Sequence, residues 1–416
     1  MTDLNKQNTL YFPNLDGLRF IAFLLVFVNH LVACLGHKTT TPIVNKIKSD
    51  YLLNGDLGVN FFFVLSGFLI TYLLLKEKEK YTTINIRSFY LRRVLRIWPL
   101  YFLVLGICFL LIPFFTTALP AGFPISNSTT ILDKNLYVFF LGNFDYVKNG
   151  ISNAIVGVLW SVSIEEQFYL FWPLLLTIFP RKHLAKLFIG LIIFSVYFRL
   201  YGGSGKTLNL MQHYHTFSCL SDLATGALFA QLCCSEKFLL FFRKLNPFVI
   251  VFVYTIGIAL IVFRMDFFRL EFTQNEYLKH INFHGNGIKP RPHQYWRSFM
   301  PLVYSLFFAF VMMEQIFSER SFFKIGKIKL FTYLGKISYG LYCFHMIALF
   351  VVVYILMKLG YNITTPDKKI ILIEAFADFG LTILFSVLSF NYFEKKFLSF
   401  KEKIAINFVQ KGTKKK

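Results

Sequence analysis

Long apolar runs alternate with short basic segments along the whole chain. Each run of about 18 to 22 residues is long enough to cross a hydrocarbon core of about 30 Å as a helix that rises about 1.5 Å per residue. The pattern predicts an all-α polytopic integral membrane helix bundle with about ten transmembrane helices. The ten predicted spans lie at approximately 15–36, 57–75, 94–114, 159–179, 184–201, 214–233, 245–263, 297–316, 337–357 and 370–391.

The basic residues between the runs set the expected orientation. An even number of spans places both termini on one side, and Lys and Arg are more numerous in the segments on that side. The positive-inside rule therefore predicts cytosolic termini. The first run follows the polar entry NLDGLR and lacks a signal-peptide cleavage site, so we expect it to remain as the first span. We predict a transmembrane domain over residues 1–400 and a basic cytosolic tail over 401–416.

Composition narrows the possible partners. Hydrophobic residues make up 56% of the chain and charged residues 16%, which argues against a water-soluble fold. The net charge of +22 comes from residues beside the apolar runs, so it indicates contact with membrane lipid and no nucleic acid partner. The six cysteines show no CxxC or Cys/His ligand spacing, and we expect neither a disulfide framework nor a metal site.

Three ionisable residues share one stripe of the first span. Arg19 and His30 are eleven positions apart, which returns the helix to within about 20° of its starting direction. Asp16 precedes Arg19 by three positions, and we expect an ion pair between them. Ionisable groups inside hydrocarbon usually face a protein interior or an aqueous cavity. The alternative is that Asp16 and Arg19 only anchor the interface and that His30 fills a polar gap.

A basic cluster precedes the third span. Arg92 and Arg93 each lie about one helical turn from Arg96, so these arginines can grip a phosphate through charge-assisted hydrogen bonds. The alternative is that they only fix the topology.

The fourth span carries the adjacent carboxylates Glu165 and Glu166, which cannot share one helix face. Helix rise places His30 and Glu165 at similar depths, about 8 Å and 9 Å from the outer face. We therefore predict that Glu165 holds one ring nitrogen of His30 and leaves the other as a general base. The alternative is that a Glu pairs with a buried Arg.

His345 lies between His30 and the arginine cluster in its predicted depth. It either lines the same cavity or is a core histidine bonded to a neighbour.

The sequence resembles acyltransferase family 3, whose members O-acylate sugars of bacterial surface polysaccharides, cell wall or exported molecules. The family's Arg-x10-His motif falls on Arg19 and His30, and its Arg-x-x-Arg motif on Arg93 and Arg96. Its acidic motif after a Trp-Ser pair falls on Glu165. The resemblance extends over about residues 12–398 through the stretches LDGLRFIAFLLVFVNH, GDLGVNFFFVLSGFLIT, RRVLRIWPLYF, LWSVSIEEQFYLFWPL, LATGALFAQL, LGKISYGLYCFHM and FNYFEKKFL. Departures occur at Lys396, where Pro is usual, and at Met346, where relatives often have Trp.

The resemblance implies a multi-pass enzyme of the bacterial inner membrane with a cytosolic acyl-CoA donor, by default acetyl-CoA, and a carbohydrate acceptor. It implies that His30 is the catalytic residue. We expect His30, oriented by Glu165, either to deprotonate the acceptor hydroxyl or to carry the acyl group transiently. Some members carry an extracellular hydrolase-like domain that is not found in this sequence, so any such extracytoplasmic partner would be a separate protein. The residues expected to bind the donor are Arg19, Arg92, Arg93 and Arg96, and those expected to line the cavity are Asp16, Ser163, Tyr339 and His345.

Two other function classes stay open on the sequence. A transporter or flippase would use buried charges along a translocation route, and it predicts inverted repeats, of which the sequence shows no convincing sign. A membrane scaffold or sensor would tolerate loss of His30.

Overall fold

The computed structural model describes residues 11–36, 55–116, 132–150, 154–203, 208–262, 292–361 and 368–400. Within these ranges the regular structure is helical and no strand occurs, which confirms the all-α prediction. The long helices are α1 (Pro13–Gly36), α3 (Gly55–Tyr81), α4 (Ile86–Gly106), α9 (Trp160–Ile178), α10 (Arg181–Tyr201), α12 (Thr216–Leu232), α14 (Pro247–Val262), α17 (Pro292–Phe317), α19 (Ser338–Lys358) and α20 (Lys368–Leu388). The short ones are η2 (Ile107–Leu111), α5 (Pro113–Thr116), α6 (Lys134–Val138), α7 (Gly142–Asn149), α8 (Ala154–Gly157), α11 (Leu208–Tyr214), α13 (Glu236–Arg243), η4 (Ile325–Lys327), α18 (Lys329–Lys336) and η5 (Ser389–Glu394).

The helices define a multi-pass membrane protein, although the predicted count of ten spans is not confirmed. Every predicted span is helical, yet among the described residues seven helices are long and apolar enough to cross a membrane. An eighth is reached if α12 and α13, which are bent by 99°, form one span. Two of the predicted spans, α9 and α14, are not among these helices. The carboxylates of α9 lower its mean hydropathy, and the 16 residues of α14 rise only about 24 Å as a helix, which is less than the thickness of the hydrocarbon core. The cytosolic location of the termini stays a prediction, and residues 1–10 and 401–416 lie outside the described ranges.

Helices α3 and α12 pack closely because each has a glycine at the contact. A Cβ atom at Gly67 would lie 2.0 Å from the carbonyl oxygen of Leu223, and one at Gly226 would lie 2.1 Å from that of Val64. Small residues at membrane-helix interfaces let two backbones approach and gain dispersion contacts. This contact fixes the position of α3 at the centre of the bundle.

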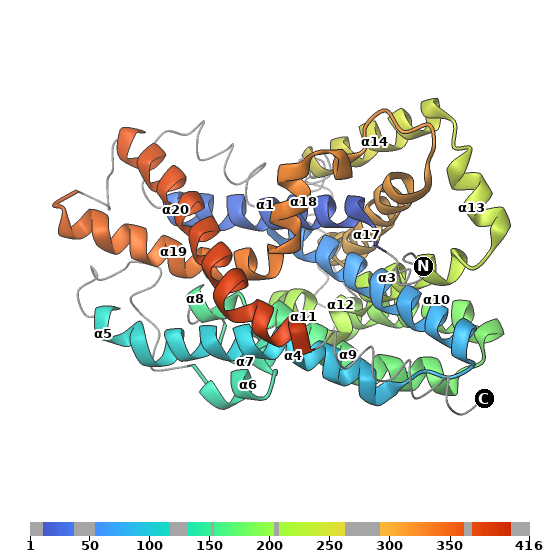
Figure 1. Ribbon diagram of the computed structural model, residues 1–416, viewed down its shortest axis with the longest axis horizontal. Coiled ribbons are helices and arrows are strands. Elements are labelled where there is room, and N and C mark those ends of the chain that lie inside the picture. Colours follow the sequence, from blue (N-terminus) through green and yellow to red (C-terminus); the bar gives the residue numbers. More distant parts are fainter. Residues whose placement is uncertain are drawn as a thin grey trace, which may run out of the picture.

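Helix α1 lies against α3, α18 and α19, and α20 packs on α19 and crosses the front of the bundle obliquely (Figure 1). Phe20, Phe23 and Phe27 of α1 form one buried cluster with Leu334 and Leu341. With this apolar face packed, the position of Arg19 and His30 within the bundle is fixed.

Helices α6 and α7 pack onto the long helices. The hydroxyl group of Tyr101 on α4 donates to the carbonyl oxygen of Tyr137 at 2.7 Å. The amide of Gln167 on α9 donates to the carbonyl oxygen of Phe140 at 2.8 Å. These bonds hold α6 and α7 against the bundle and support the first turns of α9.

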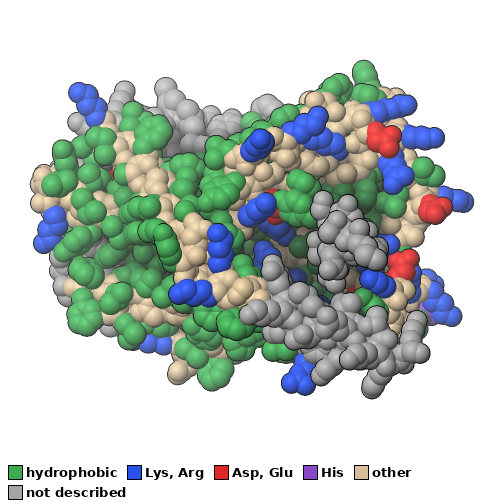
Figure 2. Space-filling model, in the orientation of Figure 1, with side chains coloured by type: hydrophobic (Ala, Val, Ile, Leu, Met, Phe, Trp, Pro, Cys, Tyr) green, Lys and Arg blue, Asp and Glu red, His purple; other side chains and the backbone are tan. Residues whose placement is uncertain are grey.

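The charge distribution on the surface distinguishes the two ends of the bundle. Figure 2 shows hydrophobic side chains over the region of α19 and α20, and Lys and Arg side chains gathered mainly toward α3 and α13. Lys78 and Lys80 lie in the last turn of α3, and Arg243 in the last turn of α13. The basic end is the one at which α4 begins, which is where the arginine cluster lies.

Candidate active site

The ion pair predicted in the first span is present. Nη1 of Arg19 lies 2.7 Å from Oδ1 of Asp16, one turn earlier on α1. Asp16 is buried and stands in the first turn of α1, where the helix dipole favours a negative charge. No partner for its second carboxylate oxygen is found among the described residues. Asp16 therefore anchors the guanidinium group of Arg19, which lines the cavity described next.

Arginine side chains from α1 and α4 meet at one cavity of about 100 Å³. Its lining combines these cations with one carboxylate, several hydroxyl groups and apolar walls. The lining residues are Arg19, Val59, Phe62, Phe63, Ser66, Leu69, Ile70, Arg93, Arg96, Ile97, Ser161, Val162, Glu165, Tyr169, Ser338, Tyr339 and Tyr342. Three cations in one partly buried cavity favour an anionic occupant.

Arg93 is held by aromatic rings. Its guanidinium carbon lies 5.6 Å from the ring centroid of Phe89 and 5.5 Å from that of Tyr169, which is the range of cation–π contacts. Its Nε atom is buried without a hydrogen-bond partner among the described residues. The side chain is thus oriented by stacking and retains an unused donor.

Arg92 lies outside this group. It donates to the hydroxyl group of Ser88, and its Nη2 atom is 3.4 Å from the carboxylate of Glu77. It is absent from the cavity lining, so the expectation that it joins Arg93 and Arg96 is not met. The reason is helical rotation, because adjacent positions on α4 point about 100° apart.

Glu165 belongs to the arginine cavity and does not contact His30. Its carboxylate accepts a hydrogen bond from Ser66, whose hydroxyl oxygen accepts one from Tyr169 at 3.2 Å. The predicted hydrogen bond between Glu165 and His30 is therefore wrong. Helix rise suggests similar depths for the two groups, but it does not give the direction in which each helix presents its side chain. The adjacent Glu166 accepts from Nε1 of Trp98 at 2.8 Å, as expected for a carboxylate on another face.

His30 is paired with His345. Nδ1 of His30 lies 3.1 Å from Nε2 of His345, and Nδ1 of His345 lies 2.6 Å from the carbonyl oxygen of Tyr342. A carbonyl only accepts, so His345 carries its proton on Nδ1 and accepts at Nε2. His30 then donates from Nδ1, and its Nε2 atom holds a free lone pair. His345 thus fixes the tautomer that leaves His30 as a base.

Only one of the four residues expected to line the cavity does so. Tyr339 lines it, with its hydroxyl group donating to the carbonyl oxygen of Ile97 at 3.1 Å. Ser163 is fully buried and bonds to the carbonyl oxygen of Leu159 at 3.2 Å. Asp16 acts through Arg19, and His345 is a buried histidine bonded to a neighbour.

Sequence reasoning missed Ser66, Ser161 and Tyr342 as cavity residues. Ser66 is a polar residue within the apolar run FFFVLSGFL, which is a signal that could have identified it. Tyr342 precedes His345 by one helical turn and therefore lies on the same helix face. A site that includes His345 would for this reason be expected to include Tyr342.

No group of three or more possible metal ligands occurs in the described part of the chain. The five cysteines described there are free thiols, and four of them are buried.

An arginine-lined cavity beside a histidine pair, inside a membrane helix bundle, defines a membrane protein equipped to bind an anion and to move a proton. The chain belongs to acyltransferase family 3, because the acyltransferase domain of that family matches residues 12–390.

Relatives in this family are similar over most of the chain. A Staphylococcus aureus (strain COL) protein named "Putative O-acetyltransferase" is 29% identical over 93% of this chain and 57% of its own length. The O-acetyltransferase OatA of Staphylococcus aureus (strain NCTC 8325) is 28% identical over 80% of this chain and 50% of its own. The peptidoglycan O-acetyltransferase OatA of Listeria monocytogenes is 28% identical over 60% and 37%. The matched region thus covers 57%, 50% and 37% of the lengths of these three relatives, and no solved structure matches the chain.

Proposed function

We propose that this chain is an O-acetyltransferase of the bacterial cytoplasmic membrane. In this proposal it moves an acetyl group from acetyl-CoA, bound at the basic end, to a hydroxyl group of a carbohydrate on the outer side. Membership of the acyltransferase family supports the reaction class. The name of the Listeria relative, a peptidoglycan O-acetyltransferase, supports a cell-envelope carbohydrate as the acceptor.

The donor end of the site is formed by Arg93, Arg96 and Arg19. Guanidinium groups bind phosphate oxygens through paired, charge-assisted hydrogen bonds, and coenzyme A offers several phosphate groups. The unused Nε donor of Arg93 and the anchoring of Arg19 by Asp16 both suit such a ligand. Glu165 limits the mutual repulsion of the three cations, so that the cavity can stay assembled when the donor is absent.

The acceptor end centres on Nε2 of His30. The acceptor hydroxyl oxygen attacks the thioester carbonyl carbon while Nε2 takes the hydroxyl proton. The carbon–sulfur bond then breaks, and the sulfur leaves with that proton as the free thiol of coenzyme A. The products are the acetylated carbohydrate and coenzyme A. The alternative, in which His30 carries the acetyl group transiently, uses the same lone pair and transfers the same atoms overall.

The observation that carries the proposal is the bond from His30 to His345, because it leaves a lone pair on Nε2 of His30. A histidine that only filled a polar gap would not need its tautomer fixed by a second buried histidine. A non-catalytic membrane scaffold or sensor would not require this arrangement of the two histidines.

The experiment that tests the proposal compares the wild-type protein with His30→Ala in membrane vesicles. Radiolabelled acetyl-CoA is supplied on the basic side and purified peptidoglycan fragments on the other, and labelled acetyl ester is measured. We expect transfer by the wild type and a loss of about 10²- to 10⁴-fold in the variant at equal membrane expression. Undiminished transfer by His30→Ala would refute the role of His30. A wild-type protein that moves carbohydrate across the vesicle membrane without consuming the thioester would favour a flippase.

A further inference from the structure

Tyr342 touches both halves of the proposed site. Its side chain lines the arginine cavity, while its carbonyl oxygen accepts the hydrogen bond from Nδ1 of His345. The ring centroids of Tyr342 and His345 are 5.8 Å apart. Neither His30 nor His345 lines the cavity. A thioester bound at the arginines therefore meets the ring of Tyr342 before it meets the histidine pair.

The hydroxyl group of Tyr342 is fixed by two hydrogen bonds. It donates to the carbonyl oxygen of Val158 at 2.8 Å and lies 2.7 Å from the hydroxyl oxygen of Ser161. The phenol has a single hydrogen, so Ser161 is the donor in the second bond. Ser161 lies in the first turn of α9 and Val158 two residues before that helix begins, whereas Tyr342 belongs to α19. The hydroxyl group thus ties α19 to the chain at the entry of α9.

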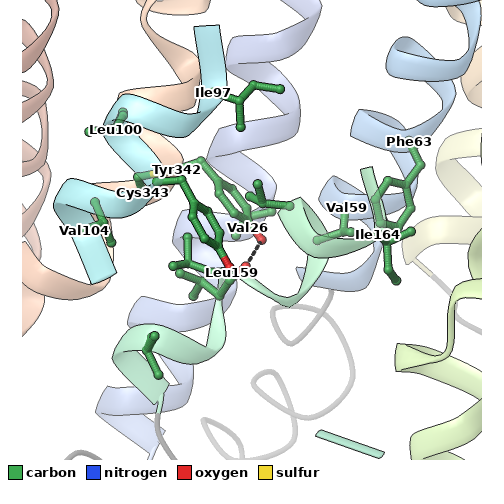
Figure 3. Packing of buried hydrophobic residues seen from close by; sticks show 14 of the residues in the cluster. Val26, Val59, Phe63, Ile97, Leu100, Val104, Leu159, Ile164, Tyr342 and Cys343 are labelled. Carbon is green, nitrogen blue, oxygen red and sulfur yellow. Dashed lines mark hydrogen bonds between the residues drawn. The ribbon is translucent and has the colours of Figure 1, made fainter. Parts of the chain in front are cut away.

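Apolar side chains pack the ring on its other sides. Phe62 meets it edge to face, with centroids 5.9 Å apart. Tyr342 belongs to one buried cluster with Val26 and Leu159, shown together in Figure 3. Val26 is fully buried and lies one turn before His30 on the same face of α1. Tyr342 thus lines the cavity and belongs to the same buried cluster as the residue of α1 that lies one turn before His30.

On the basis of the function proposed above, we propose that Tyr342 is the partition between the donor cavity and the His30–His345 pair. Ser161 and the Val158 carbonyl hold it closed, and the thioester reaches His30 only when the ring moves aside. Such a partition keeps water on the acceptor side from cleaving the bound thioester to acetate and coenzyme A. It also makes transfer depend on a side-chain movement that an arriving substrate can trigger.

The first experiment measures how much thioester is lost to water. Vesicles with Tyr342→Ala, Tyr342→Phe or Ser161→Ala are compared with the wild type for acetate release without acceptor and for acetyl transfer with it. We expect the ratio of hydrolysis to transfer to rise about 10-fold or more in Tyr342→Ala, where the ring is removed. In Tyr342→Phe and Ser161→Ala we expect a rise of about 3-fold or more, since one or two hydrogen bonds are lost.

The matched control is Tyr254→Phe, which removes a tyrosine hydroxyl bonded to Glu314 at 2.9 Å, away from this site. Its ratio should equal that of the wild type. An unchanged ratio in Tyr342→Ala would overturn the partition. Equal loss of hydrolysis and transfer in both Tyr342 variants, at normal expression, would also overturn it, because Tyr342 would then serve only folding or the chemical step.

The second experiment needs no activity and so separates this proposal from the proposed function. Val26→Cys places a thiol in the same buried cluster as Tyr342, one turn before His30, and a small charged thiosulfonate reagent is added from the basic side. Modification of that thiol is followed by mass spectrometry of its peptide. We expect the rate to rise about 10-fold or more when Val26→Cys is combined with Tyr342→Ala. If Val26→Cys is modified at the same rate with and without the ring of Tyr342, the partition is overturned even if acetyl transfer is confirmed. If the modification rate rises but no acetyl transfer is found, only the proposed function is overturned.

Discussion

Nδ1 of His30 lies 3.1 Å from Nε2 of His345, and this contact joins α1 to α19 in the interior of the membrane bundle. Like the carboxylate beside many catalytic histidines, His345 accepts the hydrogen bond from one ring nitrogen of His30 and leaves the other nitrogen unprotonated. A neutral histidine achieves this without placing a charge among apolar side chains, where an unpaired carboxylate would cost several kcal/mol. The carbonyl oxygen of Tyr342 completes the chain of bonds.

The first prediction concerns His345. We expect His345→Ala to lower kcat about 10- to 100-fold, because His30 then loses the acceptor that fixes its tautomer. The apparent KM for acetyl-CoA should stay within about 2-fold, since His345 does not line the donor cavity. Initial rates at varied acetyl-CoA concentration measure both kcat and KM. The control is His345→Gln, which retains an acceptor oxygen and should keep more activity than His345→Ala. A raised KM at unchanged kcat would place His345 with the donor instead.

The second prediction separates Arg92 from Arg93 and Arg96 on α4. Arg93→Ala and Arg96→Ala should each raise the apparent KM for acetyl-CoA about 10-fold or more, because a hydrogen bond to a charged group is worth about 1.5–3 kcal/mol. Arg92→Ala should raise it less, since its side chain bonds to Ser88 and Glu77. Binding of labelled coenzyme A to purified protein measures the difference. Equal weakening by all three substitutions would show that the total charge at this end, and not the cavity, binds the donor.

The third prediction concerns Asp16 and Arg19. Because Asp16 is buried, removing Arg19 leaves an unpaired carboxylate, and we expect Arg19→Gln to lower the melting temperature more than Asp16→Asn does. The double variant should recover part of the loss, with a coupling of about 1–3 kcal/mol, since Arg19 retains some exposure. Thermal unfolding in detergent measures all four proteins. Additive losses would indicate that the two side chains act separately.

Local patterns predicted the helices and the residues near one another on one helix, and they failed for contacts between helices. The apolar runs identified the ten long helices but not the short ones, and the spacing of Asp16 and Arg19 predicted their ion pair. Both predictions depend on the geometry of a single helix. The partner of His30 was predicted from depth alone. Depth is shared by residues on every helix of a bundle, and only the packing of α1 on α19 decides that His345 is the neighbour of His30.

The fourth prediction tests the helix contact that holds the site together. In Gly226→Ala, the new methyl group would lie 2.1 Å from the carbonyl oxygen of Val64, so α3 and α12 must separate. We expect a loss of folded protein and a fall in transfer, because α3 also carries Ser66, which bonds to Glu165. Fluorescence-detected size exclusion and acetyl transfer per folded molecule measure the two effects. Gly190→Ala on α10 is the matched control, because its methyl group would meet nothing within 4 Å, and it should match the wild type in both measurements. If both variants behaved alike, the close approach of α3 and α12 would not govern the geometry of the site.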